Sequence, residues 1–218
     1  MQLEQISSVD DSTDSMNRLL ESDTKIAFVG YPGSGKGEQG KIFAKHGMQG
    51  IITSEELKQH AAALAESNPE TAKAIREAMR NGGLALDEEV TSMMRGIVTR
   101  VSKACFIDGF PRNGNQARQS SDFMAGTHFI HLKIPRVVAK NRIFADVRGR
   151  DDDKDPEIVE RRLQLFDKDM SSLLDECTHI GEIIEVEFHH VDETAESVNR
   201  RILELLKPHL NVDLAEAA

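Results

Sequence analysis

The sequence predicts an α/β protein in which helices cover both faces of a parallel β-sheet, giving three layers. Short apolar runs have the length of buried strands, and amphipathic helical segments alternate with them along the chain. We expect the strands at residues 26–29, 51–53, 105–107, 129–134 and 183–188. Strands that are apolar throughout and separated by helices are typical of a parallel sheet buried on both sides.

Helices are predicted in the segments between and after these strands. They are expected at residues 36–46, 55–66, 69–80, 87–101, 136–143, 156–174 and 195–207. Asn68 and Pro69 form a start signal, with Asn68 as the cap, and Asp87 and Thr194 are predicted to cap later helices. Residues 1–23 read as an N-terminal extension, where Met16 and Leu19 have the spacing of a helix that docks on the body.

Length and composition favour one globular core. The chain has 218 residues, of which 39% are hydrophobic, and a net charge of -10, which argues against a general nucleic-acid binder. Cys105 and Cys177 are too few for a disulfide framework and are predicted to be buried. No apolar run approaches the length of a membrane span, and we expect a cytoplasmic monomer with no membrane partner.

A glycine-rich loop follows the first predicted strand. Gly30 and Gly35-Lys36 have the Gly-x-x-x-x-Gly-Lys spacing of a phosphate-binding loop, although Gly37 stands where Ser or Thr is expected. Backbone N–H groups of such a loop, together with the N-terminus of the next helix, attract phosphate. The alternative is a glycine-rich turn without a ligand.

A second polar motif follows the third predicted strand. Residues 108–116 read Asp-Gly-Phe-Pro-Arg-Asn-Gly-Asn-Gln. In open α/β sheets, ligands bind at the carboxyl ends of the strands. Both motifs begin there, so the sequence predicts that they share one site.

Together the two motifs resemble the adenylate kinase family of nucleoside monophosphate kinases, in which Gly also follows the loop lysine. The resemblance implies a fold of the P-loop NTPase type with a five-stranded parallel sheet. It also implies a kinase-like domain at residues 24–208, a monophosphate-binding lobe at 53–86, a very short lid at 142–156 and a C-terminal tail at 209–218. The lid has no Cys cluster, which excludes a zinc-bearing lid.

The same resemblance implies roles for individual residues. Lys36 would hold the β- and γ-phosphates of ATP, Arg112 the phosphate of AMP, and Asp108 a magnesium ion through its waters. Gln116 would form a hydrogen bond with the acceptor base. Thr53 stands at a position where the members that accept AMP also have Thr. The implied donor site comprises Gly30, Pro32, Gly33, Ser34, Gly35, Lys36, Gly37, Glu38 and Arg142. The implied acceptor site comprises Thr53, Lys58, Asp108, Gly109, Phe110, Arg112 and Gln116.

Three further arginines match positions that bind the nucleotides in the family. Arg142 corresponds to the arginine that stacks on adenine, and Arg150 and Arg162 to those that clamp the transferred phosphoryl group. With Lys36 and Arg112, the last two form the expected catalytic set. Planar guanidinium groups suit this task. The alternative for each arginine is a solvated salt bridge.

Four positions depart from the family pattern and weaken expected contacts: Glu38, Lys58, Asp146 and Glu193. Glu38 either repels the triphosphate or ligates magnesium, and we favour repulsion. The expected function is magnesium-dependent phosphoryl transfer from ATP to AMP. The alternatives are a catalytically weak relative that binds nucleotide, and a kinase of another small substrate. His179 and the pair His189-His190 are expected to be surface or packing residues rather than metal ligands.

Overall fold

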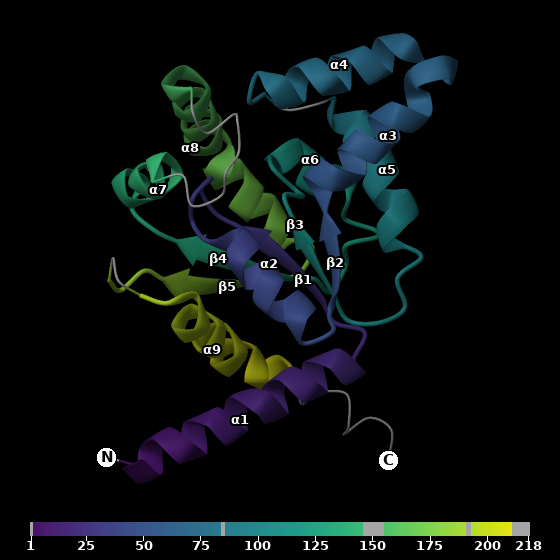
Figure 1. The fold of residues 1–218 in the computed structure, drawn as a ribbon. Coiled ribbons are helices and arrows are strands. Elements are labelled where there is room, and N and C mark those ends of the chain that lie inside the picture. The colour runs from purple at the N-terminus through teal and green to yellow at the C-terminus, as the bar shows by residue number, and fades with distance from the viewer. Residues whose placement is uncertain (1, 84–85, 146–154, 191–192, 211–218) are drawn as a thin grey trace.

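The computed structural model describes residues 2–83, 86–145, 155–190 and 193–210, and the side chains from Ser12 onward (Figure 1). Its sheet has five strands in the order β2-β3-β1-β4-β5, and every neighbouring pair is parallel. The strands are β1 (Lys25–Val29), β2 (Gln49–Ile52), β3 (Cys105–Asp108), β4 (His128–Lys133) and β5 (Glu182–Glu187). All the predicted strands are confirmed, with ends shifted by at most two residues.

Helices cover both faces of the sheet, as predicted. They are α1 (Gln2–Glu21), α2 (Lys36–Lys45), α3 (Thr53–Ser67), α4 (Pro69–Arg80), α5 (Asp87–Val98), α6 (Gly114–Gln119), α7 (Arg136–Phe144), α8 (Pro156–Thr178) and α9 (Ala195–Leu206), followed by the 3-10 turn η2 (Lys207–His209). Helices α1, α2 and α9 share one core with Phe28 and Ile130, whereas α3, α4, α5, α6 and α8 share the other with Ala27 and Phe129. Alternate residues of β1 and β4 therefore enter opposite cores, which explains why these strands are apolar throughout.

The N-terminal extension forms a long helix that is part of the fold. Met16 and Leu19 are 3% and 0% exposed and lie in the same core as Ile202 and Leu206 of α9. Figure 1 shows α1 crossing the base of the molecule beside α9. The predicted docking of this segment is confirmed.

Two local predictions differ from the structure. Asp87 is the first residue of α5 rather than its cap, because its carboxylate accepts hydrogen bonds from the side chains of Asn113, Asn115 and Gln116. Helix α6 was not predicted, since its six residues carry no apolar period. It begins where the side chain of Asn113 accepts a hydrogen bond from the Gln116 N–H at 2.8 Å.

Other expectations concern the cysteines and the membrane. Cys105 and Cys177 are buried and unbonded, and burial raises the pKa of their thiols to about 11 and about 12. Among the described residues, no helix is both long and apolar enough to cross a bilayer. The predicted lid is described only at residues 142–145 and 155–156, so Asp146 and Arg150 lie outside the described residues.

Candidate active site

The loop between β1 and α2 has the backbone that a phosphate-binding loop requires. Gly30, Gly33 and Gly35 have positive φ angles of 147°, 89° and 101°, which disfavour other residues. A Cβ at Gly33 would lie 2.4 Å from the carbonyl oxygen of Ala139 in α7. The glycine therefore also permits the close approach of α7 to this loop.

Lys36 begins α2 and folds back across the loop. Its Nζ donates hydrogen bonds to the carbonyl oxygens of Gly30 and Tyr31 at 2.6 and 2.8 Å. The buried hydroxyl of Ser34 lies 3.4 Å from the same nitrogen. This arrangement places the ammonium group at the mouth of the loop, next to the N-terminus of α2, where both favour an anion.

Asp108 ends β3 beside this loop. It is the register partner of Phe28 in β1 and of Ile52 in β2. A Cβ at Gly37 would lie 3.9 Å from its Oδ2 atom, so the carboxylate faces the first turn of α2. Glu38 is in the same turn, but its carboxylate accepts a hydrogen bond from Lys41 Nζ at 2.7 Å. Lys41 therefore partly offsets the negative charge of Glu38 beside the loop.

Arg112 and Thr53 approach each other from two elements. Arg112 Nε donates to the carbonyl oxygen of Gly109 at 2.8 Å. A Cβ at Gly109 would lie 3.0 Å from Arg112 Nη2 and 3.5 Å from the Cβ of Thr53. Thr53 is the first residue of α3, is 1% exposed, and its Oγ1 has no hydrogen-bond partner among the described residues. A buried hydroxyl without a partner is unfavourable unless a ligand supplies one.

Gln116 is buried next to the segment that carries Arg112. Its side chain is 1% exposed, and Oε1 accepts a hydrogen bond from the Arg112 N–H at 2.8 Å. Its Nε2 donates to Asp87 Oδ1 at 2.9 Å. Both ends of the amide are thus engaged by protein groups, and Gln116 fixes the backbone that carries Arg112.

Two more predicted acceptor residues have distinct surroundings. Phe110 is fully buried and lies 6.2 Å from Phe123, centroid to centroid, so its side chain belongs to the core. Lys58 is exposed on α3. The structure therefore gathers Asp108, Gly109, Arg112 and Thr53 closely, and leaves the Phe110 side chain out of that group.

Arg142, Arg162 and Glu193 each contact other parts of the protein. The guanidinium carbon of Arg142 lies 5.3 Å from the ring centroid of Phe188, a cation–π contact. Glu193 is 6% exposed and accepts a hydrogen bond from Arg201 Nη1 at 2.5 Å, which lowers the pKa of its carboxyl. The stem of Arg162 lies beside the loop after α4, since a Cβ at Gly82 would be 2.9 Å from Arg162 Cγ.

A polar network that the sequence analysis missed ties the loop to α7 and α8. The hydroxyl of Tyr31 donates to Asp167 in α8, which also accepts from Arg136 in α7 at 2.9 Å. The Tyr31 ring lies 4.3 Å from that of Phe166. Burial, and then the hydrogen bond to Asp167, raise the pKa of Tyr31 to about 12. The position of Tyr31 within the loop was a signal, but its partners are more than 100 residues away.

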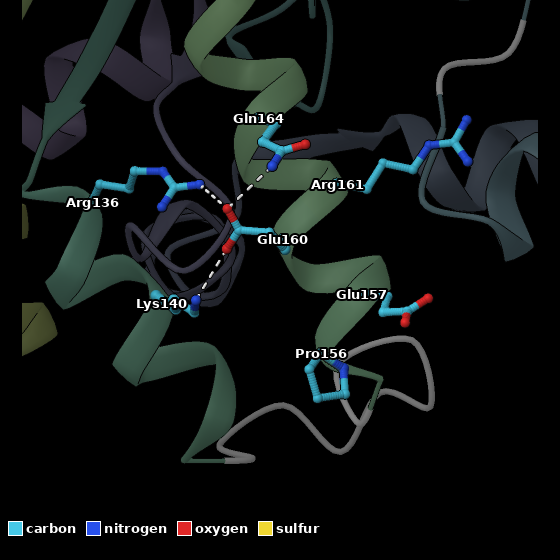
Figure 2. Close-up of a pocket in the computed structure, with 7 residues that line it drawn as sticks. All are labelled: Arg136, Lys140, Pro156, Glu157, Glu160, Arg161 and Gln164. Carbon is cyan, nitrogen blue, oxygen red and sulfur yellow. Dashed lines mark hydrogen bonds and ion pairs between the residues drawn. The ribbon is translucent and has the colours of Figure 1, made fainter.

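A pocket of about 590 Å³ lies on the same two helices (Figure 2). Figure 2 shows Glu160 at its centre, held by Arg136 and Lys140 at 2.5 and 3.0 Å. None of the predicted site residues within the described part of the chain lines this pocket. The Glu160 carboxylate is paired with two cations, so we do not assign the predicted chemistry to the pocket.

Comparison with known proteins fits this geometry. Residues 28–181 match the sequence model of the family described as Adenylate kinase. The chain belongs to the adenylate kinase family. It is 30% identical to the adenylate kinase of Prochlorococcus marinus (strain NATL1A) over 75% of this chain and 89% of that protein. It is 31% identical to the adenylate kinase of Stenotrophomonas maltophilia over 84% of this chain and 99% of that protein.

One relative is a phosphotransferase with a different donor nucleotide in its name. The mitochondrial GTP:AMP phosphotransferase of Drosophila melanogaster is 30% identical over 69% of this chain and 82% of that protein. As a member of the adenylate kinase family, the chain is a phosphotransferase of the nucleoside monophosphate kinase class. The resemblance seen in the sequence is confirmed.

Proposed function

We propose that this adenylate kinase family member transfers a phosphoryl group reversibly from magnesium-bound ATP to AMP, giving ADP. The main support is the position of two segments at the carboxyl ends of adjacent strands. The loop before Lys36 follows β1, and the segment from Asp108 to Arg112 follows β3. A donor phosphate on the first and an acceptor phosphate on the second would meet there. Phosphoryl transfer depends mainly on such positioning and on nearby cations.

The donor would lie on the loop of residues 30–37, with its outer phosphates against Lys36. Arg142 would then stack on the base, a role supported by its position over the Phe188 ring. The carboxylate of Glu193 points to Arg201 and not to an open surface, which limits its repulsion of a nucleotide.

The acceptor would lie against Thr53 and Arg112. The buried Thr53 hydroxyl without a partner supports this placement, because a nucleotide could supply the missing hydrogen bond. Arg112 would hold the phosphate, and Lys58, which is exposed on α3, would add positive charge. Gln116 would position Arg112 and would bond the acceptor base through its second amide N–H. Similarity to adenylate kinases and to a GTP:AMP phosphotransferase favours AMP as the acceptor.

Asp108 would hold the magnesium ion through water. The donor set fits, since a carboxylate oxygen faces the first turn of α2 beside the loop. When bound there, magnesium would supply positive charge beside the phosphates. Glu38 is the second carboxylate in reach of this turn, although it pairs with Lys41.

Arg150 and Arg162 would clamp the phosphoryl group as it moves. Arg162 belongs to α8, and its stem lies beside Gly82 in the loop after α4, which supports a role next to the proposed lobe. We propose residues 53–86 as the monophosphate-binding lobe and 142–156 as the lid, within a kinase domain of residues 24–208 that works as a cytoplasmic monomer.

A protein that binds nucleotide without efficient turnover is the second candidate. Glu38 and Lys58 favour it, because both depart from the family pattern at positions that would contact phosphate. The pairing of Glu38 with Lys41 and of Glu193 with Arg201 favours the active enzyme, since both added carboxylates have cationic partners.

A coupled assay tests the proposal. Purified protein is supplied with ATP or GTP as donor and with AMP, UMP, CMP or GMP as acceptor, with and without magnesium. We expect the fastest turnover with ATP and AMP, strictly dependent on magnesium and lost in Lys36→Met. Binding of a two-headed adenosine polyphosphate without turnover would support the second candidate, and faster use of UMP or CMP would contradict the acceptor.

A further inference from the structure

A cluster of two histidines and a glutamate lies at the end of the sheet opposite the proposed active site. His128 and Glu182 are the first residues of β4 and β5, whereas the phosphate loop follows the carboxyl end of the neighbouring strand β1. His209 is the last residue of η2. The nucleotide chemistry proposed above uses none of these side chains.

The potential ligand atoms of these residues converge. One ring nitrogen of His128, one of His209 and one carboxylate oxygen of Glu182 all lie within 4.8 Å of one another. The glutamate oxygen lies 3.7 Å from His128 Nδ1 and 2.8 Å from His209 Nδ1. Two ligands bound tetrahedrally at zinc are about 3.3 Å apart, so shifts of about half an ångström would bring the two pairs that include Glu182 to that separation. The two histidine nitrogens lie within 4.8 Å of each other and would have to approach to the same separation.

One of these atoms is buried without a partner. His128 Nδ1 is inaccessible to solvent and makes no hydrogen bond among the described residues, although it faces Glu182 at 3.7 Å. A buried polar atom of this kind is uncommon in a stable fold. A metal ion between the three side chains would give it the partner that it lacks.

Rigid backbone holds His128 and Glu182 together. They are register partners, and the Glu182 N–H donates to the Thr127 carbonyl at 3.1 Å. The backbone at Gly181 lies even closer to Thr127, since a Cβ at Gly181 would be 2.0 Å from the Thr127 carbonyl oxygen. Only glycine permits this approach, so the spacing of the first two ligands is built into the strand pair.

The third ligand is anchored by the last helix. Leu203 and Leu206 of α9 are 3% and 0% exposed, and Leu210 packs against the same core. These contacts hold η2 on the sheet, with the His209 ring 5.4 Å from the His128 ring, centroid to centroid.

We propose that His128, Glu182 and His209 bind one zinc ion, which fastens the C-terminal turn to the edge of the sheet. Two imidazole nitrogens and one carboxylate oxygen are a zinc donor set, whereas magnesium prefers oxygen ligands alone. Glu182 and His209 are 48% and 29% exposed, so water can reach the site and complete the coordination. The site is separate from the magnesium proposed at Asp108.

Calorimetric titration of zinc into the full chain, stripped of metal by a chelator, tests the proposal. We expect one zinc ion per chain with micromolar or tighter affinity, and a zinc-dependent rise in the midpoint of thermal unfolding. His128→Ala and His209→Ala should each weaken binding at least tenfold. Glu182→Gln is the variant least liable to misfold, because its side chain is half exposed, and it should weaken binding as well.

Two matched variants control for other histidines. His131→Asn changes a second buried histidine of β4, whose Nδ1 faces Glu185 at 3.5 Å, and His179→Ala changes an exposed histidine close to Glu182. Neither should alter zinc affinity or the zinc-dependent midpoint. Absence of zinc binding by the folded wild type would overturn the proposal. Binding that survives Glu182→Gln and His209→Ala but is lost on replacing His189 and His190 would overturn it too.

Discussion

Glu38 adds a negative charge next to the phosphate-binding loop. Its carboxylate lies in the first turn of α2, where the helix dipole favours an anion, and Lys41 donates a hydrogen bond to it at 2.7 Å. The pair is largely exposed, at 43% for Glu38 and 72% for Lys41, so the pairing is weak and reversible. A triphosphate on the loop would therefore meet a carboxylate that is only partly offset.

The first prediction is that Glu38→Thr tightens ATP binding and raises the kinase rate. Removing the carboxylate relieves repulsion that is stronger in a partly dry pocket than in water. Lys41→Met should weaken ATP binding in the wild type but have a smaller effect in Glu38→Thr, because Lys41 then has no carboxylate to offset. The measurement is ATP affinity and rate across a magnesium titration for the four proteins. Weaker ATP binding by Glu38→Thr at saturating magnesium would instead assign Glu38 to the metal.

Tyr31 offers a second prediction at the residue scale, because it is the single tyrosine of a chain that has no tryptophan. Burial and the hydrogen bond to Asp167 raise its pKa to about 12, from 10.0 in an unfolded chain. The folded state therefore keeps the proton at pH values where the unfolded state loses it. The stability that Tyr31 contributes is complete below pH 10 and is lost as pH rises toward 12.

Absorbance of the tyrosinate in the ultraviolet measures this titration directly. We expect a midpoint well above that of the denatured chain, and a lower midpoint in Asp167→Asn. In the variant the nearby negative charge is gone and the acceptor is a neutral amide oxygen, while the burial remains. Tyr31→Phe provides the baseline. A folded protein that titrates near pH 10 would contradict the network between the loop and α8.

At the scale of the element, α1 contributes to the stability of the whole domain. It lies against α9, and Met16 and Leu19 are enclosed with residues of α9 and β1. The apolar spacing in the sequence was enough to predict this docking, since only a helix brings these residues to one face.

The third prediction is that Leu19→Ala lowers the free energy of unfolding by about 3 kcal/mol, as expected for a fully buried leucine. The exposed neighbour Asn17 provides the matched control, because Asn17→Ala changes the same helix without opening a cavity. Urea unfolding measures both. Equal stability of the two variants would mean that α1 does not pack on the core in solution.

At the scale of the molecule, features that depend on neighbouring residues in the sequence could be predicted, whereas features that depend on distant residues could not. Each strand was recognisable because its own residues are apolar, and the phosphate loop because its glycines and Lys36 are adjacent. Helix α6 was missed because its six residues carry no apolar period. The role of Asp87 was missed because amide side chains 26 to 29 residues away determine it. The histidine cluster was missed for the same reason, since His209 meets His128 only after α9 has packed.

The sheet also separates the two halves of the site. Lys36 stands on the loop after β1, whereas Arg112 is held after β3 by Gly109 and Gln116. Because these anchors belong to different elements of one rigid sheet, a change in one half should leave the other in place. Donor and acceptor binding are therefore expected to respond separately to substitution.

The last prediction tests this separation. Lys36→Met should weaken ATP binding at least tenfold, or about 1.4 kcal/mol, and change AMP binding much less. Arg112→Ala should have the opposite pattern, because its guanidinium lies beside Gly109 and Thr53 on the acceptor side. Calorimetric titration of each nucleotide into the wild type and the two variants measures all six affinities, with circular dichroism as the check on folding. If Arg112→Ala impaired ATP and AMP equally, Arg112 would have to act on both nucleotides, and the division of the site between β1 and β3 would be wrong.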